Sequence, residues 1–498
     1  MILQEITMKK LPILLKLLFI INLVFLNNII VLASSETSTS IFEKAKKAIV
    51  TIDTRIAVSA YDDTSSWTGT GFINNKNNGY IITNTHVVGG ASIGTYFVTF
   101  YNGEQAEAKL IYYDIWQDYA VLKVESKDIP ASATQISFAS ELPKLNQKVF
   151  VVGNTEAKGF SFHTGYLSDL YNIEGLMPQC TYVINLNTTG GASGSPVLND
   201  KIEAIGVLYG GGKTHSLALH GDYVARTLES LKNNKQPGRK HIGIISELYS
   251  LNKAVRHHNF PKEEMDKYIK KFPDSRNRVI SIKAVLAGSP AAKSLKAGDI
   301  IWAVNDKELG GNLALFDREM DNFKGIAIKL TIFRDGKKLE QVVDLYDVNN
   351  NKIAKMINFG GAVFFEADDY FSNKSGIPLK ALSIASVQSG SSFSSIPTFF
   401  TKDYKNVYRL QIFEMKALAL SNLDDLVKFL PAITKEKFIT VRFRNYQPYY
   451  ANFGYNELIS SHDDMIADVT LDSIDTKPYI LKYNTISHDW DMENIKLQ

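Results

Sequence analysis

Short apolar segments rich in β-branched and aromatic residues alternate with polar turns from residue 49 to residue 209. These segments read IVTI, YIIT, YFVTFY, YAVLKV, KVFVVG, YVINLN and IEAIGVLY. Asn78-Gly79 and Asn102-Gly103 lie between such segments, and this dipeptide supplies the positive φ angles that tight hairpins need. So many short strands at regular spacing predict antiparallel barrels or sandwiches.

A helical pattern follows this β-rich region. In DYVARTLESLK, residues 222–232, the side chains of Val224, Leu228 and Leu231 fall on one helical face. The polar stretch NNKQPGRK comes next and predicts a solvated linker. We therefore place the end of the first globular domain near residue 235.

Two later segments resemble each other and suggest an internal repeat. The first reads AGDIIWAVNDKELGGNLALFDREMDNF and then IAIKLTIFRDGKKLE; the second reads VYRLQIFEMKALALSNLDDLVKFL and then KFITVRFRNYQ. In both, a strand and a turn lead into a helix and a second strand. Asn305 precedes Phe333 by 28 positions, and Glu414 precedes Phe443 by 29. The agreement predicts two copies of one unit.

Size and composition limit the classes of function. The 498 residues exceed what one core holds and predict about three domains. Lys and Arg number 55 against 52 Asp and Glu, a net charge of +3 without a long basic block, so nucleic acid is not an expected partner. Cys180 is the single cysteine, which excludes an intramolecular disulfide and a cysteine-based zinc cluster. His257-His258 and His462-Asp463-Asp464 lack the helical spacing of metal ligands, so we expect no metal and no cofactor.

The N-terminal segment has the layout of a signal peptide over residues 1–33. Lys9, Lys10 and Lys16 precede an apolar run that reaches Ala33 and is followed by Ser/Thr-rich sequence. We expect cleavage near Ala33; the alternative is a retained membrane anchor, because the run from Leu17 is about long enough to span a bilayer. Export without disulfides suits a bacterial envelope compartment, with the periplasm as the expected location.

Three separated stretches carry candidate catalytic residues. GTGFINNKNNGYIITNTHVV turns at His86, DIWQDYAVLKV places Asp118 just before a strand, and GGASGSPVL presents Ser193 in a glycine turn. The order His, Asp, Ser and the spacings of 32 and 75 positions suit two small barrels that share a cleft. Asp114 competes with Asp118 for the role of the carboxylate, but it lacks the strand YAVLKV at the same offset.

The chemistry of acyl transfer explains these residue types. A serine hydroxyl is a poor nucleophile at neutral pH, so a neutral imidazole, here His86, must accept its proton. The imidazolium that forms needs a carboxylate that holds its tautomer and offsets its charge, which is the role open to Asp118. The glycines around Ser193 allow backbone N–H groups to converge on an oxyanion, and Gly191 and Ser193 are the expected donors.

These three stretches resemble the HtrA/Deg family of serine proteases. That family has the blocks G-[ST]-G-F…G-Y-[IV]-[IV]-T-N-x-H-V-V, D-[LY]-A-V-L-K-[IV] and G-N-S-G-G-P-[LV], and the resemblance extends from about residue 40 to about residue 345. It implies a multidomain, mainly β protein, in which a chymotrypsin-like double β-barrel protease domain is followed by a PDZ domain and a second PDZ-like domain. On this resemblance His86, Asp118 and Ser193 match the triad, and Gly191 matches the oxyanion-turn glycine.

The chain departs from the family pattern around the nucleophile. Ala192 stands where the family has Asn, Ser195 where it has a second Gly, and Gly190 where Arg is often found. These changes put the rate of catalysis and the shape of the oxyanion turn in question. Ser195 is expected to have no catalytic role. An α/β-hydrolase elbow is disfavoured, because that motif requires a helix after the serine and a histidine last in chain order.

The resemblance also assigns the repeats. It implies a protease domain over residues 34–235, a PDZ domain over 236–346 and a PDZ-like domain with a C-terminal extension over 347–498. HIGIISEL looks like a degenerate carboxylate-binding loop that leads into the first PDZ strand, with Gly243 and Ile244 as the best candidates for peptide contact. The second copy has GGAVFF at the corresponding place.

The predicted function is that of an exported serine endopeptidase. The resemblance implies unfolded or damaged proteins as substrates, peptide C-termini as PDZ ligands, and assembly into a homo-trimer or a larger homo-oligomer. A specificity pocket near residues 187–191 and 207–211 would accept small or medium apolar side chains. The alternative is a chaperone or scaffold on the same fold, in which the altered turn at Gly190, Ala192 and Ser195 leaves the protease weak or inactive.

Overall fold

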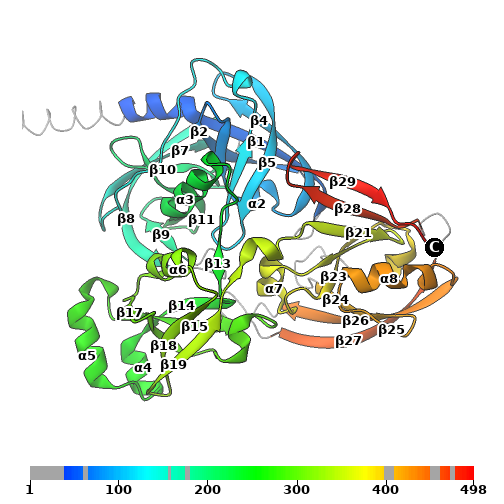
Figure 1. The fold of residues 1–498 in the computed structure, drawn as a ribbon. Coiled ribbons are helices and arrows are strands. Elements are labelled where there is room, and N and C mark those ends of the chain that lie inside the picture. The colour runs from blue at the N-terminus through cyan, green and yellow to red at the C-terminus, as the bar shows by residue number, and fades with distance from the viewer. Residues whose placement is uncertain are drawn as a thin grey trace, which may run out of the picture.

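The computed structural model of this chain describes residues 39–59, 66–154, 159–173, 180–396, 409–448, 460–471 and 477–497. It contains two closed barrels and two larger open sheets (Figure 1). The signal segment predicted for residues 1–33 lies outside the described residues. No helix in the described ranges is long and apolar enough to cross a bilayer.

The first barrel has the strand order β1-β2-β3-β6-β5-β4. Its strands are β1 (Ile49–Ser59), β2 (Ser66–Asn75), β3 (Tyr80–Thr83), β4 (Ser92–Phe100), β5 (Gln105–Asp114) and β6 (Tyr119–Lys123). The short helix α2 (Thr85–Val88) follows β3, and the 3₁₀ turns η1 (Lys46–Ala48) and η2 (Ser126–Asp128) flank the barrel in sequence. Gly79 and Gly103, at φ 71° and 90°, form the turns that the two Asn-Gly dipeptides predict.

The second barrel has the order β10-β11-β12-β9-β8-β7. Its strands are β7 (Lys148–Asn154), β8 (Phe160–Asn172), β9 (Thr181–Ile184), β10 (Pro196–Leu198), β11 (Ala204–Gly211) and β12 (Ser216–His220). The predicted helix is α3 (Gly221–Lys232), and Val224 lies in the core while Leu228 and Leu231 pack against it. Two closed barrels in succession confirm the predicted chymotrypsin-like architecture.

The first open sheet follows in the order β14-β15-β16-β18-β19, with β17 paired to β16. Its strands are β14 (Ile244–Ser250), β15 (Arg278–Val285), β16 (Ile300–Val304), β17 (Lys307–Glu308), β18 (Ala327–Arg334) and β19 (Lys337–Asp344). Its helices are α4 (Leu251–His257), α5 (Lys262–Lys271) and α6 (Leu313–Asn322), with 3₁₀ turns η4 (Pro273–Ser275) and η5 (Pro290–Lys293). A separate two-stranded sheet joins β13 (Lys240–His241) to β20 (Tyr346–Asp347).

The second open sheet has the order β27-β26-β24-β23-β22-β21-β28-β29, with β25 paired to β24. Its strands are β21 (Lys355–Phe359), β22 (Ala362–Glu366), β23 (Leu382–Val387), β24 (Arg409–Met415), β25 (Leu418–Ala419), β26 (Phe438–Pro448), β27 (Ser460–Thr470), β28 (Tyr479–Asn484) and β29 (Asp489–Asn494). Its helices are α7 (Asp369–Ser375) and α8 (Leu423–Ile433), with η6 (Val348–Asn351) and η7 (Ser392–Ser395).

The two open sheets are built from the same unit, as the repeat in the sequence predicts. The succession β16, β17, α6, β18 recurs as β24, β25, α8, β26, and each helix is capped by an asparagine. The side chain of Asn312 accepts the N–H of Leu315, and that of Asn422 accepts the N–H of Asp425. In each helix the asparagine side chain accepts the backbone N–H three residues later, and this cap fixes where the helix begins.

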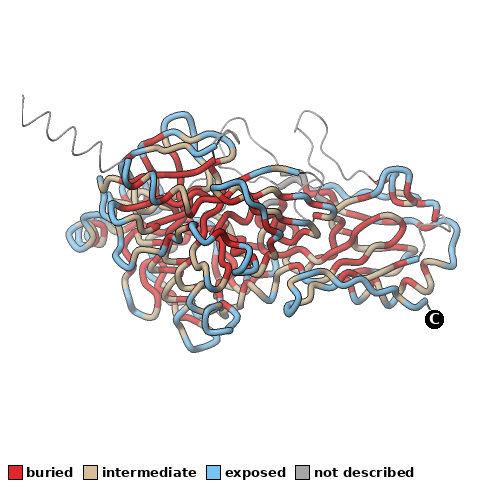
Figure 2. The backbone as a smooth tube through the Cα atoms, turned by 90° about the horizontal axis from the view of Figure 1, so that it is seen from above, coloured by how far each residue is buried: buried red, intermediate tan, exposed pale blue. Residues whose placement is uncertain are grey.

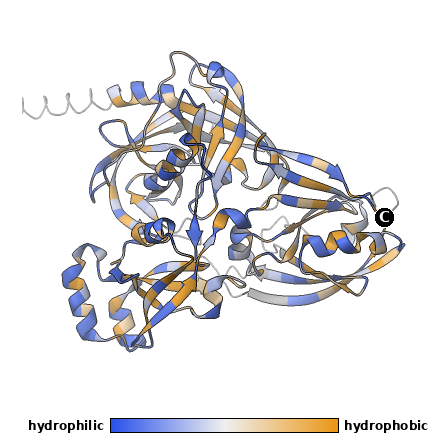
Figure 3. Ribbon diagram, in the orientation of Figure 1, coloured by the Kyte–Doolittle hydropathy of each residue, from blue (hydrophilic) through white to orange (hydrophobic). Residues whose placement is uncertain are grey.

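Burial follows the alternation expected of half-buried strands. Along β5 every second residue from Ala106 to Asp114 is buried, and apolar and polar residues alternate along the barrel strands (Figure 3). Buried backbone lies inside the barrels and sheets, and exposed backbone gathers in loops and at the ends (Figure 2). The linker after α3 departs from the prediction of a solvated segment, because Arg239 within it is only 4% exposed.

Candidate active site

Helix α2 carries His86 at the mouth of the first barrel. Asn84 is the residue before the helix, and the Thr85 side chain is buried. Thr85 Oγ1 lies 2.9 Å from the carbonyl oxygen of Asp114 and 2.8 Å from that of Tyr119. These contacts join the start of α2 to the loop between β5 and β6. They therefore hold His86, on α2, at a fixed distance from Asp118, in the loop.

Asp118 contacts His86 through both carboxylate oxygens. Its Oδ2 lies 2.7 Å from His86 Nδ1, and its Oδ1 accepts the backbone N–H of His86 at 3.0 Å. Asp118 has φ 53°, an unusual conformation for a residue other than glycine, and its carbonyl oxygen accepts the Asn84 side-chain amide at 2.8 Å. The carboxylate is mostly shielded while the imidazole side chain is 46% exposed, so the histidine keeps one face toward the cleft.

Asp114, the competing carboxylate, has a different environment. It is 1% exposed, and its Oδ1 accepts the backbone N–H groups of Trp116 at 2.8 Å and Gln117 at 3.0 Å. This arrangement forms the turn that precedes Asp118. Asp114 therefore shapes the loop, and Asp118 is the carboxylate paired with His86.

The loop that carries Ser193 is bonded directly to the first barrel. The N–H of Thr70 donates to the Ser193 carbonyl oxygen at 2.9 Å, and Thr70 Oγ1 donates to the Gly191 carbonyl oxygen at 2.7 Å. Thr83, three positions before His86, donates from Oγ1 to the carbonyl oxygen of Thr70 at 2.8 Å. The serine loop thus contacts β2 at Thr70, next to the end of β3, which leads into α2. The half-buried Ser193 hydroxyl donates to the Tyr209 carbonyl oxygen at 3.3 Å.

The backbone around Ser193 has the glycine conformations that the sequence predicts. Gly191 and Gly194 have φ 91° and 89°. The Gly194 N–H donates to the Leu208 carbonyl oxygen at 2.8 Å. In the part of the chain that the structure describes, the N–H groups of Gly191 and Ser193 donate to no protein acceptor, which leaves them for a ligand.

Ser195 stabilises this turn through hydrogen bonds on its buried side. Its Oγ donates to the Ala192 carbonyl oxygen at 2.6 Å, and its own N–H donates to the same oxygen at 3.0 Å. The residue is fully buried. A Cβ placed on Gly153 would lie 1.9 Å from Ser195 Oγ, so the serine hydroxyl in this position leaves no room for a side chain at residue 153.

We expect a Gly194→Ala variant to be strongly destabilised, whereas Gly190→Ala is not. A Cβ on Gly194 would lie 1.9 Å from the backbone oxygen of Thr70 at a positive φ, while a Cβ on Gly190 meets nothing within 4 Å. Strain and overpacking each cost about 1–3 kcal/mol, and unconstrained surface changes stay within about 0.5 kcal/mol. Thermal unfolding of both variants measures this, and equal melting temperatures would contradict the packing described here.

A buried ionic cluster joins the Asp118 loop to the first open sheet. Arg239 is its centre: Nε lies 3.3 Å from Asp114 Oδ2, Nη2 lies 3.1 Å from Asp317 Oδ2, and Nη1 lies 2.9 Å from Asp321 Oδ2. Asp317 also accepts the hydroxyl of Tyr223 at 2.7 Å. Burial raises the pKa of Asp317, and Arg239 and Tyr223 oppose that shift. A buried guanidinium among carboxylates requires all of these partners to be present.

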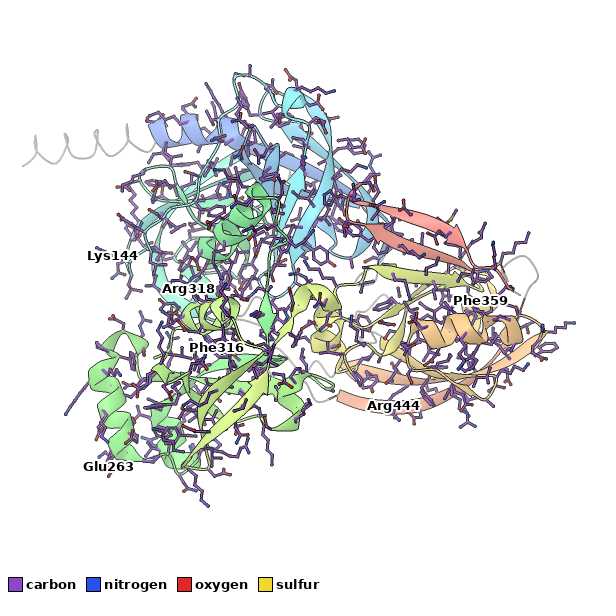
Figure 4. The ribbon with its side chains drawn as sticks, viewed as in Figure 1. Lys144, Glu263, Phe316, Arg318, Phe359 and Arg444 are labelled. Atoms are coloured by element: carbon purple, nitrogen blue, oxygen red, sulfur yellow. The ribbon has the colours of Figure 1, made fainter. Side chains whose placement is uncertain are left out.

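Helix α6 presents different residues to the barrel and to its own sheet. Phe316 belongs to the hydrophobic core, and Arg318 donates to Asp222 Oδ2 at 2.9 Å across the domain boundary (Figure 4). Gln117, next to Asp118, donates to Asp317 at 3.1 Å. The helix of the first repeated unit therefore contacts the loop that positions the catalytic candidate.

The tip of the same loop contacts both repeated units. The ring of Trp116 packs on His241 with centroids 3.8 Å apart, and its Nε1 donates to Asp369 Oδ1 at 3.1 Å. Ile115 and Trp116 share an apolar cluster with Ile245 of β14. The backbone on either side of Asp118 is thus buried between the barrel and the two sheets.

Gly243 and Ile244, the predicted peptide contacts, lie at the start of β14. Gly243 has φ 87°, and its N–H donates to His241 Nδ1 at 3.0 Å. Ile244 is fully buried. A Cβ on Gly243 would lie 2.1 Å from Cβ of Ser289. The loop is closed on itself, so a peptide carboxylate must displace the His241 side chain to reach this amide.

The second unit repeats this loop. Gly361 has φ 77°, and a Cβ there would lie 2.2 Å from Cβ of Ser391. The Gly361 carbonyl oxygen accepts the N–H of Gln388 at 2.8 Å, as that of Gly243 accepts the N–H of Leu286 at 2.9 Å. The glycines of HIGI and GGAV therefore occupy equivalent positions.

The two units differ in how the strand after this glycine is paired, which is β14 in the first unit and β22 in the second. In the second unit β21 pairs with β22, so the chain itself covers that edge. In the first unit β14 pairs with β15 and with no other described strand. Among the described strands, β14 therefore has one unpaired edge, whereas β22 is paired on both sides.

We expect buried His220 to make the stability of the second barrel depend on pH. Its ring stacks on Tyr182 with centroids 3.8 Å apart, its Nε2 lies 2.8 Å from the Leu170 carbonyl oxygen, and burial lowers its pKa to about 4. The unfolded chain binds a proton below about pH 6.5 and the folded chain only below about pH 4, so stability falls as the pH drops through this window, by roughly 3 kcal/mol.

Urea unfolding near pH 7.5 and near pH 4.5 tests this assignment. We expect a His220→Gln variant to lose less stability on acidification than the wild type, and a His257→Gln variant, changed at an exposed position of α4, to behave as the wild type does. The same loss in all three proteins would mean that other groups govern the acid response.

Comparison with known proteins matches part of this chain to a domain family. The family model of the trypsin-like peptidase domain matches residues 69–207. An uncharacterized protein of Rickettsia prowazekii (strain Madrid E) is 91% identical over 192 residues, which is 39% of this chain and 99% of that protein. The pro-apoptotic serine protease NMA111 of Debaryomyces hansenii is 27% identical over 431 residues, 83% of this chain and 42% of that protein. The chain thus spans less than half the length of this second relative.

Two solved structures are similar at lower identity. The HtrA-type protease AlgW with a tripeptide is 18% identical with a TM-score of 0.46, covering 62% of this chain and 97% of that one. The serine endoprotease of Yersinia pestis is 20% identical with a TM-score of 0.41, again covering 62% and 97%.

The matched segment contains His86, Asp118 and Ser193, and it runs from β2 into β11, across both barrels. The predicted class of serine endopeptidase is confirmed at the level of this domain. The chain therefore contains a trypsin-like peptidase domain over residues 69–207 and is similar over most of its length to the serine protease NMA111.

Proposed function

We propose that this protein is a serine endopeptidase of the HtrA type that uses Ser193 as nucleophile, His86 as general base and Asp118 as the carboxylate. The observation that carries the proposal is the double contact of Asp118 with His86, at 2.7 Å to Nδ1 and 3.0 Å to the backbone N–H. This contact fixes the Nδ1–H tautomer and leaves Nε2 as the basic nitrogen. The docking of the Ser193 loop on Thr70 supports the nucleophile's place in the same cleft.

The reaction proceeds by acyl transfer. Ser193 Oγ attacks the peptide carbonyl while His86 takes its proton, and Asp118 offsets the charge of the imidazolium. The N–H groups of Gly191 and Ser193 receive the oxyanion. His86 then donates the proton to the leaving amine, and water hydrolyses the acyl-enzyme by the same steps. A protonated imidazole cannot act as base, so activity declines on acidification.

The substrate and the location are part of the same proposal. We expect cleavage of unfolded or damaged exported proteins in a bacterial envelope compartment, after small or medium apolar residues. Assembly into trimers or larger homo-oligomers belongs to the same expectation. Peptide ends add to the open edge of β14, near Gly243 and Ile244, and the second unit, whose edge is covered by β21, takes none in this way.

Active-site labelling tests the proposal. A fluorophosphonate probe is expected to label the wild-type chain and a Ser195→Ala variant, and not a Ser193→Ala variant, because only an activated serine reacts. Peptide mapping of the adduct identifies the residue. Labelling that survives in Ser193→Ala would move the nucleophile elsewhere, and no labelling of any of the three folded proteins would favour the alternative of an inactive chaperone or scaffold.

A further inference from the structure

A cavity of about 420 Å³ lies where the first barrel meets the C-terminal part of the chain. Strands β4 and β5 form one wall, and the segment around Lys352 and the β28–β29 hairpin form the other. Figure 1 shows this hairpin, in red, extending from the second open sheet to β5. The lining residues do not include His86, Asp118 or Ser193, so this cavity is separate from the proposed catalytic cleft.

The cavity exists because two neighbouring strands of the barrel part. Strands β4 and β5 pair only from Tyr96 opposite Ala108 to Thr99 opposite Gln105. Beyond that register β4 stays with β1 and β5 stays with β6. The two strands diverge toward Ser92 and Tyr113, and the gap between them opens toward the C-terminal part.

Side chains from the C-terminal part satisfy the carbonyl groups along this gap. Trp490 Nε1 donates to the Ser92 carbonyl oxygen at 3.2 Å, and the Tyr483 hydroxyl donates to that of Leu110 at 2.9 Å. Lys352 Nζ donates to the carbonyl oxygen of Tyr113. Specific hydrogen bonds therefore fix the two walls of the cavity relative to each other.

Lys352 places a positive charge in this cavity. Its Nζ lies 4.0 Å and 4.4 Å from the ring centroids of Tyr112 and Tyr113. Among the described residues, Lys352 contacts a backbone carbonyl oxygen and feels Asp114, Asp347 and Asp368 only from a distance, whereas Lys109, the other lysine of the lining, pairs with Asp489 at 2.6 Å. A shielded ammonium without a carboxylate is costly and favours an anionic partner.

An anionic partner would favour the protonated form of Lys352. Burial lowers its pKa to about 8, while Asp114, Asp347 and Asp368 act in the opposite direction from a distance. The group is thus mostly protonated at neutral pH and still lacks a contacting anion.

Much of the rest of the lining is apolar, and its two carboxylates, Glu107 and Asp489, both pair with Lys109. Ala91 and Tyr96 are buried, and Ile93, Ile111 and Trp490 are only partly covered. Cavities of about 300–1,000 Å³ with apolar walls and a few polar groups are typical of small-molecule sites. The walls suit an aliphatic body, and Lys352, which has no ion-pair partner among the described residues, suits one carboxylate.

We propose that this cavity binds a small amphiphilic monocarboxylate, with the carboxylate at Lys352 and the aliphatic chain between β4 and the β28–β29 hairpin. The inference does not depend on the catalytic assignment. Octanoate is the probe, and 1-octanol of the same chain length is its uncharged counterpart.

Isothermal titration of the full chain with octanoate tests the proposal. We expect one saturable site in the wild type, and affinity reduced about tenfold or more in Lys352→Met, because a hydrogen bond to a charged group is lost. Lys355→Met is the matched control, since Lys355 lies on β21 and pairs with Asp424 outside the cavity; it should bind as the wild type does. 1-Octanol should bind about tenfold more weakly than octanoate to the wild type.

A second variant keeps the test decisive if Lys352→Met does not fold. Ile93→Trp narrows the cavity while Lys352 remains, and it should abolish octanoate binding with a wild-type circular dichroism spectrum. Equal affinity of wild type and folded Lys352→Met, equal affinity for octanol and octanoate, or the absence of a saturable site would each overturn the proposal.

Discussion

An Asp118→Asn variant is expected to lose about 10⁴-fold in kcat while its fold persists. The asparagine retains an oxygen for the backbone N–H of His86, which Asp118 accepts at 3.0 Å. Facing Nδ1, however, its amide group no longer favours the Nδ1–H tautomer, so Nε2 ceases to be the base, and a change of this kind costs about 10⁴ in related chemistry. Steady-state hydrolysis of a peptide substrate measures it.

An Asp128→Asn variant provides the control, because Asp128 is an exposed residue of η2. Its kcat should equal that of the wild type. A loss of less than tenfold in Asp118→Asn would assign the orienting role to another carboxylate, and Asp114 would then be the first candidate to reconsider.

The second large effect is expected at Arg239. An Arg239→Met variant leaves the carboxylates of Asp114, Asp317 and Asp321 without their shared cation, and removing one partner of a buried ionic cluster costs about 3–5 kcal/mol. Thermal unfolding should show a markedly lower first transition. Activity should fall as well, because Asp114 forms the turn on which Asp118 is placed.

Arg256→Met is the comparison for this variant, since Arg256 is an exposed residue at the end of α4. It should unfold with the wild-type profile. If Arg239→Met did the same, the cluster would contribute nothing to stability, and the contact between α6 and the Asp118 loop would have to be attributed to apolar packing alone.

Much of the fold follows from local sequence patterns. The Asn-Gly turns, the amphipathic α3 and the repeated strand-turn-helix-strand unit each depend on a few neighbouring residues. The pairing of His86 with Asp118 was also foreseeable, because each residue stands at a fixed place beside a strand whose position in a barrel is regular. The choice of Asp118 over Asp114 as the catalytic carboxylate stays a prediction, and the contact of Asp118 with His86 supports it.

The parts that escaped prediction depend on residues far apart in the chain. Arg239 looks like one more basic residue in a polar linker, and its partners on α6 come about eighty positions later. The same applies to Lys352, whose contacts lie on β5. No local signal marks either residue, because burial of a charge is decided by tertiary packing.

The loop at Gly243 illustrates a third case. The φ of 87° and the close approach of Ser289 both require the glycine that the sequence has at position 243, while its predicted contact with a peptide stays a prediction. The sequence does not reveal that the backbone N–H of Gly243 donates to His241 Nδ1. Nor does it reveal that β21 pairs with β22 and so covers the equivalent edge in the second unit. Which hydrogen-bonding groups remain available depends on side chains that the motif does not specify.

The contact between Ser195 and Gly153 has an evolutionary consequence. With Ser195 present, a Cβ at position 153 is excluded; a Ser195→Gly change removes that clash and leaves Thr70 Oγ1 at 3.4 Å as the nearest contact. The two sites are therefore epistatic, and the order of mutations matters. A lineage that acquires the serine becomes committed to the glycine on β7, forty-two positions earlier in the chain.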